Sequence, residues 1–238
     1  MAKPKLSSQK QSSVKRTPEK KGAAISVAEF LKLKQPKGDL ILDVEGQPVS
    51  LTSLERVYWP DEKITKFELL RYYLEISSHI MPFLKDRPAI LQRWPRGINA
   101  PMFFQQDLES APAFIKTARL TNKEGRELDY AVYTTTASLL HFVNLGTIEQ
   151  HPWHSTIAKL DNPDWIAIDL DPKKAPWENV LQVALTVKEV CDELGLKAFP
   201  KTSAKSSNAS SSRRKSKNWR KRIASTSLYP NSPKWIST

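Results

Sequence analysis

Apolar residues recur along the middle of the chain in two patterns, one with helical spacing and one with strand spacing. Behind Thr65 and Glu68, which form a capping box, they recur every three or four positions up to Leu84, which predicts a helix. A second capping box, Ser26 with Glu29, predicts a short helix, and Glu45-Gly46 predicts the turn of a hairpin. Strands are expected at 89–94, 128–134 and 165–170, and further helices at 137–150 and 177–194.

The order of these elements predicts the fold class. Because strands and helices are interspersed, we expect an α/β (α+β) fold in which a mixed sheet is flanked by helices. Composition divides the chain into a basic N-terminal tail at 1–38, a folded domain at 39–203 and a basic, serine-rich tail at 204–238. Residues 1 to about 24 and the C-terminal tail are expected to be disordered, with a short helix between residue 24 and the folded domain.

The positive charge of the chain is concentrated in these tails. The formal net charge is +12, to which residues 1–38 contribute +8, residues 39–200 contribute −6 and residues 201–238 contribute +10. Such tails often bind nucleic acid by neutralising phosphates, but a solvated tail without a partner has the same composition.

Cysteine usage and hydropathy indicate the compartment. Cys191 is the only cysteine, which excludes a disulfide framework and a cysteine-based zinc site within the chain. The sequence holds no apolar run of membrane-spanning length and no secretory signal. We therefore expect a protein of the cytoplasm.

Two aspartates stand at the end of the strand predicted in the segment DWIAIDLDP. Side chains alternate along a strand, so Asp169 and Asp171 are expected on one face, about 7 Å apart at Cα. Carboxylates at this spacing repel each other unless a proton or a cation lies between them, and a pair of divalent cations fits there. The alternative is a polar strand end, because Pro172 follows directly and stops the strand.

Basic and aromatic side chains form further clusters in the folded part. Lys66 lies in the first turn of the helix predicted behind Thr65, where it can hold a phosphate together with the free backbone N–H groups, and Arg56 lies ten residues earlier. The alternative for Lys66 is an exposed lysine on a helix surface. A second cluster combines arginines with rings, which suits a nucleic-acid backbone with stacked bases but is also ordinary on a surface. Its members are Arg93, Arg96, Phe103 and Phe104.

Seven segments of the chain together resemble one family. In order they are LTSLERVYWP, ITKFELLRYY, DRPAILQRWPRGI, FFQQD, HPW, PDWIAIDLDP and LGLKAFPKTS. Their residues and spacing are similar to those of the polymerase (primase-like) domain of bacterial ATP-dependent DNA ligase D. This domain belongs to the archaeo-eukaryotic primase superfamily and acts in non-homologous end joining. The resemblance covers about residues 40–203.

The resemblance implies a reaction and a role for each candidate residue. The implied reaction is transfer of a nucleotide to the end of a DNA or RNA primer, with two Mn²⁺ or Mg²⁺ ions as cofactors. Asp169 and Asp171 are implied as the catalytic metal ligands, and Arg56 and Lys66 as ligands of the 5′-phosphate of a DNA break. DNA and template contact is implied for Arg93, Arg96, Phe103 and Phe104, and nucleotide binding for His151, Lys201 and Ser203.

The resemblance also implies partners and a location. The implied partners are DNA ends with a 5′-phosphate, nucleoside triphosphates, Ku and a separate ATP-dependent ligase, and the location is the bacterial cytoplasm, in association with the nucleoid. No membrane is implied.

The chain departs from the family after Ser203. In the family, a glycine-rich segment with a lysine and a Gly-Leu-His binds the nucleotide phosphates there, and a later strand supplies a third metal-binding aspartate. Residues 204–238 contain no such segment and no acid, and Gln106 replaces a lysine common in the family. The sequence therefore predicts a partial primase-polymerase domain, truncated or frameshifted after Ser203 and impaired in catalysis.

Three functions follow from these residues. The first is a DNA end-repair polymerase, and the second is a non-catalytic module that binds 5′-phosphorylated DNA ends through Arg56, Lys66 and the basic tails. The third is a phosphatase with Asp169 as nucleophile and Asp171 as acid. The third is disfavoured, because such enzymes need further acid and lysine motifs downstream and the tail supplies no acid.

Overall fold

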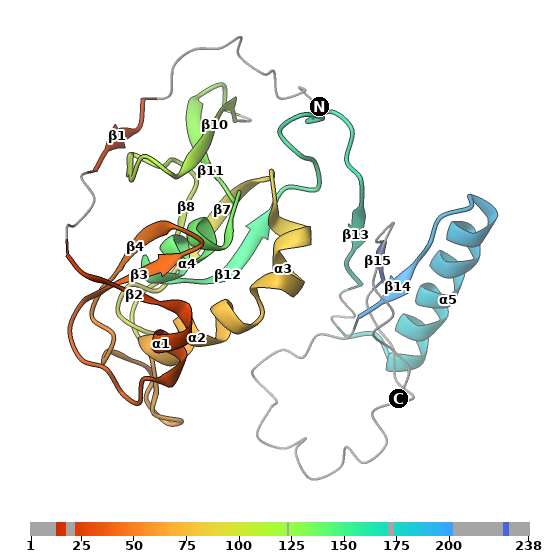
Figure 1. Ribbon diagram of the computed structural model, residues 1–238. Helices are drawn as coiled ribbons and strands as arrows, with labels where there is room; N and C mark the ends of the chain where they lie inside the picture. Colours follow the sequence, from red (N-terminus) through yellow and green to blue (C-terminus); the bar gives the residue numbers. More distant parts are fainter. Residues whose placement is uncertain (1–12, 18–21, 123, 171–173, 202–225, 229–238) are drawn as a thin grey trace. The chain divides into compact units, whose positions relative to one another are not determined.

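The computed structural model describes residues 13–17, 22–122, 124–170, 174–201 and 226–228 of the 238-residue chain. The chain forms two compact units, Met1–Asn162 and Pro163–Thr238. Helices and strands are interspersed along the chain, so the mixed α/β fold expected from the sequence is confirmed (Figure 1).

The first unit is built on a five-stranded sheet with the order β10-β11-β7-β12, in which β8 also pairs with β7. All of these pairings are antiparallel. The helices of this unit are α1 (Val27–Lys32), α2 (Lys66–Glu75), α3 (Ser77–Leu84) and α4 (Thr136–Asn144). Its strands are β1 (Lys15–Arg16), β2 (Ala24–Ser26), β3 (Leu40–Val44), β4 (Gln47–Leu51), β5 (Val57–Trp59), β6 (Ile64–Thr65), β7 (Pro88–Arg93), β8 (Phe103–Gln105), β9 (Ser110–Ala111), β10 (Lys116–Thr121), β11 (Glu127–Val132) and β12 (Thr147–Pro152).

The local signals in the sequence form as expected. Ser26 and Glu29 make both hydrogen bonds of a capping box at the start of α1, and Thr65 and Glu68 do the same for α2. Strands β3 and β4 pair as an antiparallel hairpin around Glu45-Gly46, and β2 joins β3 in parallel. The capping boxes and the hairpin depend on residues close in sequence, which is why the sequence predicts them, whereas it does not predict the pairing of β2 with β3.

The helix expected to run to Leu84 is divided into α2 and α3. Ile76, between the two helices, has φ −90° and ψ 1°, which lies outside the α-helical region. Ser77 and Ser78 follow, and serine hydroxyls compete for backbone hydrogen bonds in a helix. The apolar pattern continues across the break between α2 and α3, so the sequence does not reveal the break.

The helix expected at 137–150 is too long, because α4 ends at Asn144 and β12 begins at Thr147. Gly146 lies between them with φ +95°, a conformation that ends helices. A Cβ at this position would lie 2.9 Å from the carbonyl oxygen of Trp94, so only glycine fits. Thr147 and Ile148 are β-branched and suit the strand that follows.

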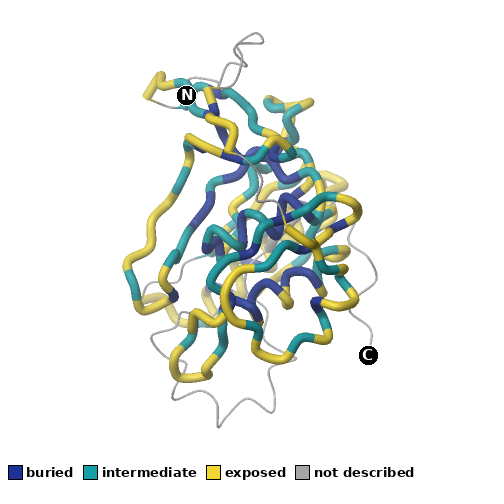
Figure 2. Tube along the Cα trace, turned by 60° about the vertical axis from the view of Figure 1, so that its left-hand side comes forward, coloured by how far each residue is buried: buried dark blue, intermediate teal, exposed yellow. Residues whose placement is uncertain are grey.

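The core of the first unit lies between α2, α4 and the strands beside them. α2 and α4 pack against each other, and α4 also contacts β4 and β12. Fully buried side chains in this core include Leu70 of α2, Leu91 of β7 and Phe142 of α4. Figure 2 shows the buried positions gathered inside this part of the chain, with exposed positions on the outer loops.

A short N-terminal strand is fastened to the same unit. β1 pairs in parallel with β9, and both the backbone N and the Oγ of Ser13 donate to Asp129 Oδ2, at 3.0 and 2.7 Å. Arg119 Nη1 donates to the same oxygen at 2.7 Å, and Asp129 is fully buried. Residues 13–17 therefore belong to the folded unit, although composition places them in a disordered tail. The contacts that hold them come from residues about one hundred positions away.

We expect Asp129→Asn to lower the free energy of unfolding by about 3 kcal/mol, because it removes the charge that pairs with the largely buried Arg119. Urea denaturation measures the change. Glu75→Gln is the matched control, because it makes the same change in an exposed ion pair with Arg71 and should cost less than about 0.5 kcal/mol. Equal losses in the two variants would show that the buried network does not hold the unit together.

The second unit contains α5 (Trp177–Glu193) and a small sheet of β13 (Ile166–Ile168), β15 (Thr226–Leu228) and β14 (Phe199–Pro200), in that order. α5 begins and ends within a residue of the prediction, and Gly195, with φ +68°, follows its end. α5 buries Val180, Ala184 and Cys191. Several other apolar side chains of this unit are exposed, namely Ile166, Leu181, Val183, Leu185, Val190, Leu194 and Leu196.

None of the helices in the described ranges is long and apolar enough to cross a membrane.

Candidate functional site

Arg56 and Lys66 meet at one corner of the first unit, which we call the cation corner. Arg56 directly precedes β5, and Lys66 directly follows β6 as the first residue of α2. The antiparallel pairing of β5 with β6 brings the two residues together, and the backbone N of Lys66 donates to the carbonyl oxygen of Arg56 at 2.8 Å. The two cations expected to act together are therefore neighbours in space.

The side chain of Lys66 is buried in this corner. Only 4% of the residue is exposed, and Nζ donates to the carbonyl oxygen and the Oγ1 of Thr52, at 2.7 and 3.3 Å. Burial, together with the smaller effect of the positive charge of Arg56, lowers the pKa of Lys66 to about 8. The alternative of an exposed surface lysine is therefore wrong, because a sequence-distant segment folds over the side chain.

The expectation that free N–H groups of α2 help to bind an anion is also wrong. The first amide of α2 donates to Arg56, as described above, and the second, of Phe67, donates to the carbonyl oxygen of Leu54 at 3.0 Å. The third, of Glu68, donates to Thr65 Oγ1 at 3.4 Å. Because the chain itself engages these donors, an anion at this corner has to be held by side chains.

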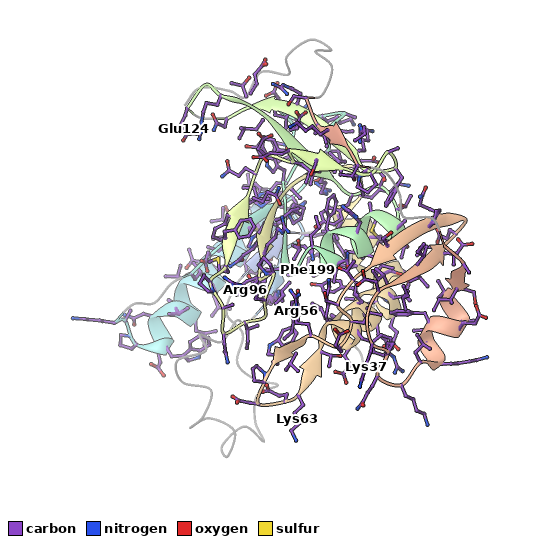
Figure 3. All side chains as sticks on the ribbon, turned by 90° about the vertical axis from the view of Figure 1, so that its left-hand side faces the viewer. Lys37, Arg56, Lys63, Arg96, Glu124 and Phe199 are labelled. Carbon is purple, nitrogen blue, oxygen red and sulfur yellow. The ribbon has the colours of Figure 1, made fainter. Side chains whose placement is uncertain are left out.

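The guanidinium group of Arg56 lies on the surface beside a second basic residue. Its Nη1 donates to the carbonyl oxygen of Pro95 at 2.5 Å, and its Nη2 lies 3.4 Å from Ser53 Oγ. Arg96 follows Pro95 and is exposed. Figure 3 labels Arg56 and Arg96 next to each other and the exposed Lys63 farther away, in the turn between β5 and β6. Arg56 thus donates to the loop that leads to Arg96. The acidic residues Asp39 and Glu55 also lie close enough to interact electrostatically with Lys66.

The aromatic cluster lies on β8, β7 and β12 and has two faces. Phe104 pairs with Gln92 and His151 pairs with Ile90, so Phe104, Gln92 and His151 share one face of the sheet. His151 Nε2 lies 2.7 Å from Gln92 Oε1, and the His151 ring meets the Phe104 ring edge to face at 5.9 Å. Phe104 is 54% exposed, so its ring is available for stacking.

Arg93 is held within the protein on the other face. Its Nε donates to the carbonyl oxygen of Leu145 at 3.0 Å, and its Nη1 donates to Gln105 Oε1 at 2.6 Å. The guanidinium carbon lies 5.1 Å from the centre of the Phe103 ring, which is a cation–π distance. Arg93 therefore positions Phe103. We call Arg93, Phe103, Phe104 and His151 the aromatic edge.

The proposed metal ligands belong to the second unit. Asp169 directly follows the last residue of β13 and is exposed, while Asp171 lies outside the described residues. The shared face predicted for the two carboxylates therefore stays a prediction. Within the described part of the chain, no three His, Cys, Asp or Glu side chains gather closely enough to hold a metal ion. Asp169 offers one carboxylate, and the second carboxylate of the proposed pair would be that of Asp171.

The remaining candidates lie after β14. Lys201 directly follows Phe199–Pro200 and is exposed, and Ser203 lies outside the described residues. Gln106, which follows β8 in the first unit, is also exposed.

Two residues that the sequence does not single out organise the cation corner. Thr52 supplies both acceptors of Lys66 Nζ, and Asn144 bonds to the backbone of Thr52. No motif marks either residue, because their roles depend on contacts between segments 14 and 92 positions apart in sequence.

Comparison with known proteins identifies the family. The sequence profile of the family described as LigD, primase-polymerase domain, matches residues 65–206, which is more than half of the chain. The matching profile defines the class as a primase-polymerase domain. The chain belongs to the LigD primase-polymerase domain family.

Individual relatives agree with this assignment. The multifunctional non-homologous end joining protein LigD of Pseudomonas aeruginosa is 32% identical over 165 residues, which make up 65% of this chain and 19% of the relative. The bifunctional non-homologous end joining protein LigD of Bacillus subtilis is 31% identical over 157 residues, covering 65% of this chain and 25% of the relative. The chain therefore spans about a fifth to a quarter of the length of these relatives.

A solved structure has a similar fold. The polymerase domain from Mycobacterium tuberculosis ligase D, in complex with DNA, superposes with a TM-score of 0.55 at 20% sequence identity. The match covers 78% of this chain and 62% of that one.

Proposed function

We propose that this protein is a DNA end-repair polymerase module that binds 5′-phosphorylated DNA ends and transfers nucleotides to a primer end. The observation that supports this most strongly is the cation corner. It holds two cations at neighbouring positions, one of them buried, and the positive charge of Arg56 disfavours the charged form of Lys66. A phosphate dianion bound there would relieve this repulsion.

The aromatic edge is proposed to contact the template strand. The exposed ring of Phe104 offers a surface on which a base can stack, and His151 beside it offers a ring nitrogen to an incoming nucleotide. Arg93 holds Phe103 in place, and the exposed Arg96 is proposed to contact the DNA backbone.

The nucleotidyl transfer is proposed to use Asp169 and Asp171 as ligands of two Mn²⁺ or Mg²⁺ ions. Such ions stabilise the attacking 3′-hydroxyl and the leaving phosphate oxygens of an in-line displacement. The role of the aspartates is to hold and orient them at the end of β13. Lys201 and Ser203 are proposed to bind the phosphates of the nucleoside triphosphate. We also propose Ku and a separate ATP-dependent ligase as partners.

A non-catalytic DNA-end binding module is the second candidate function. It is favoured by one observation: the two residues of the cation corner meet in space, whereas residues 204–238 contain no acid that could serve as a third metal ligand. Both functions predict binding of a 5′-phosphate, and only the first predicts nucleotide addition.

The pH dependence of DNA binding tests the cation corner. Burial lowers the pKa of Lys66 to about 8, so raising the pH from 7 to 9.5 removes most of its charge, while the phosphate stays dianionic. We expect the preference for a 5′-phosphate over a 5′-hydroxyl to fall over this interval, with the midpoint moved upward by the bound phosphate. Fluorescence anisotropy with both DNAs measures it. Lys66→Met should show a lower preference that does not change with pH, and parallel profiles for the two proteins would contradict the role of Lys66.

A further inference from the structure

The end of α4 is bonded to the loop that carries the acceptors of Lys66. Asn144 is the last residue of α4; its Oδ1 accepts the backbone N–H of Thr52 at 2.9 Å, and its Nδ2 donates to the carbonyl oxygen of Ser50 at 3.1 Å. One bond uses the acceptor of the amide and the other uses its donor, so a single orientation of the side chain satisfies both. Asn144 therefore fixes the end of β4 and the following loop to α4.

The next two residues of the chain are bonded to the aromatic edge. The carbonyl oxygen of Leu145 accepts from Arg93 Nε at 3.0 Å, and that of Gly146 accepts from the backbone N of Trp94 at 2.8 Å. Arg93 in turn lies over the ring of Phe103. Asn144 thus connects through Thr52 to the cation corner, and Leu145 connects through Arg93 to the aromatic edge.

We propose that Asn144 is a positioning residue that sets Lys66 for binding of a DNA 5′-phosphate, and that the end of α4 fixes the spacing between the cation corner and the aromatic edge. The proposal rests on the proposed function. Asn144 acts through Thr52: because both acceptors of Lys66 Nζ belong to Thr52, a displacement of Thr52 displaces the ammonium group as well.

The physical reason is preorganisation. A lysine side chain has four rotatable bonds, and ordering it only when the ligand arrives reduces affinity. Here the ammonium group is already held by two acceptors on a loop that Asn144 anchors. Without this anchor, the loop is free to move and solvent enters beside Lys66. The phosphate then has to order the cation itself.

The first test is Asn144→Ala. We expect the ratio of the dissociation constants for 5′-hydroxyl and 5′-phosphate gapped DNA to fall about tenfold, with the affinity for the 5′-hydroxyl DNA unchanged. A loss of folded protein affects both DNAs equally and leaves the ratio unchanged, so the ratio separates positioning from stability. An unchanged ratio in folded Asn144→Ala would overturn the proposal.

Asn122→Ala is the matched control. Asn122 Oδ1 accepts from the backbone N of Glu124 at 3.1 Å and of Arg126 at 2.9 Å, so this variant also removes a side-chain amide that bonds to the backbone. It lies in the turn between β10 and β11, and Figure 3 shows Glu124 of this turn far from Arg56. The control should keep the phosphate preference of the parent protein. A loss as large as that of Asn144→Ala would overturn the proposal.

A double variant shows whether Asn144 acts through Lys66. In a Lys66→Met background, Asn144→Ala should cause no further loss of the phosphate preference, because the group that it positions is gone. A further tenfold loss in that background would mean that Asn144 acts on another group, and would overturn the proposal.

A measurement without DNA separates this inference from the proposed function. NMR of protein with ¹³C-labelled lysine follows the titration of Lys66, which is assigned by its absence in Lys66→Met. In Asn144→Ala the pKa should rise from about 8 toward 10.5, because solvent reaches the ammonium group. Asn144→Ser gives the same test should the alanine variant fail to fold. An unchanged titration would overturn the inference, whereas a parent protein without phosphate preference would overturn the proposed function alone.

Discussion

Replacement of Asp169 by alanine should abolish metal-dependent nucleotide addition. Because residues 204–238 hold no acid, we expect the chain with this tail to add few or no nucleotides to a primer. The test therefore uses a chimera in which the tail is replaced by the matching segment of Pseudomonas aeruginosa LigD. This chimera should extend a primer with Mn²⁺, and Asp169→Ala should slow it about a thousandfold, because a carboxylate that holds the ions is lost.

The control for this experiment is Asp161→Ala, which removes an exposed carboxylate eight residues earlier in the chain. It should leave extension within about twofold of the chimera, as expected for a surface substitution away from the reacting groups. Gel analysis of primer length measures all the proteins. Undiminished extension by the Asp169→Ala chimera would show that Asp169 holds no catalytic metal, and robust extension by the chain with its own tail would show that catalysis is not impaired.

Replacement of Lys66 by methionine should remove most of the preference for a 5′-phosphate. A hydrogen bond to a charged group contributes about 1.5 to 3 kcal/mol, so we expect the ratio of the two dissociation constants to fall about tenfold to a hundredfold. Methionine fills a volume similar to that of lysine, so the buried site is not left with a large cavity. Competition binding with the two gapped DNAs measures the ratio.

Lys63→Met is the matched control for this change. Lys63 lies three residues earlier, is exposed, and carries the same charge, so both variants lower the net charge by one. Both should weaken general attraction to DNA to a similar extent. Only Lys66→Met should reduce the phosphate preference, and a similar reduction in Lys63→Met would mean that net charge alone explains it.

The sequence predicts the elements whose signals are local. The capping boxes of α1 and α2 and the hairpin of β3 and β4 involve residues within a few positions of each other, and all three form. The end of α4 is harder to predict from the sequence, because the apolar pattern continues through Gly146 into β12. The helix ends where Gly146 fits closely against the backbone of Trp94. The sequence pattern around Gly146 does not reveal this contact, because Trp94 is distant in sequence.

The sequence likewise predicts only part of the candidate site. The resemblance brings Arg56 and Lys66 to one site, and the structure places them next to each other. It does not reveal that Lys66 is buried or that the amides of α2 are engaged, because both depend on the loop around Thr52 and Leu54. The role of Asn144 is equally hidden, since its partners lie more than ninety positions earlier.

Equilibrium binding to two gapped duplexes tests the central claim most directly. The duplexes are identical in sequence and differ only in the downstream 5′ group, a phosphate in one and a hydroxyl in the other, and are compared at pH 7 and one salt concentration. The cation corner predicts binding of the phosphorylated duplex that is tighter by about tenfold or more. Equal dissociation constants would contradict the account, because Arg56 and Lys66 would then not recognise a DNA 5′-phosphate.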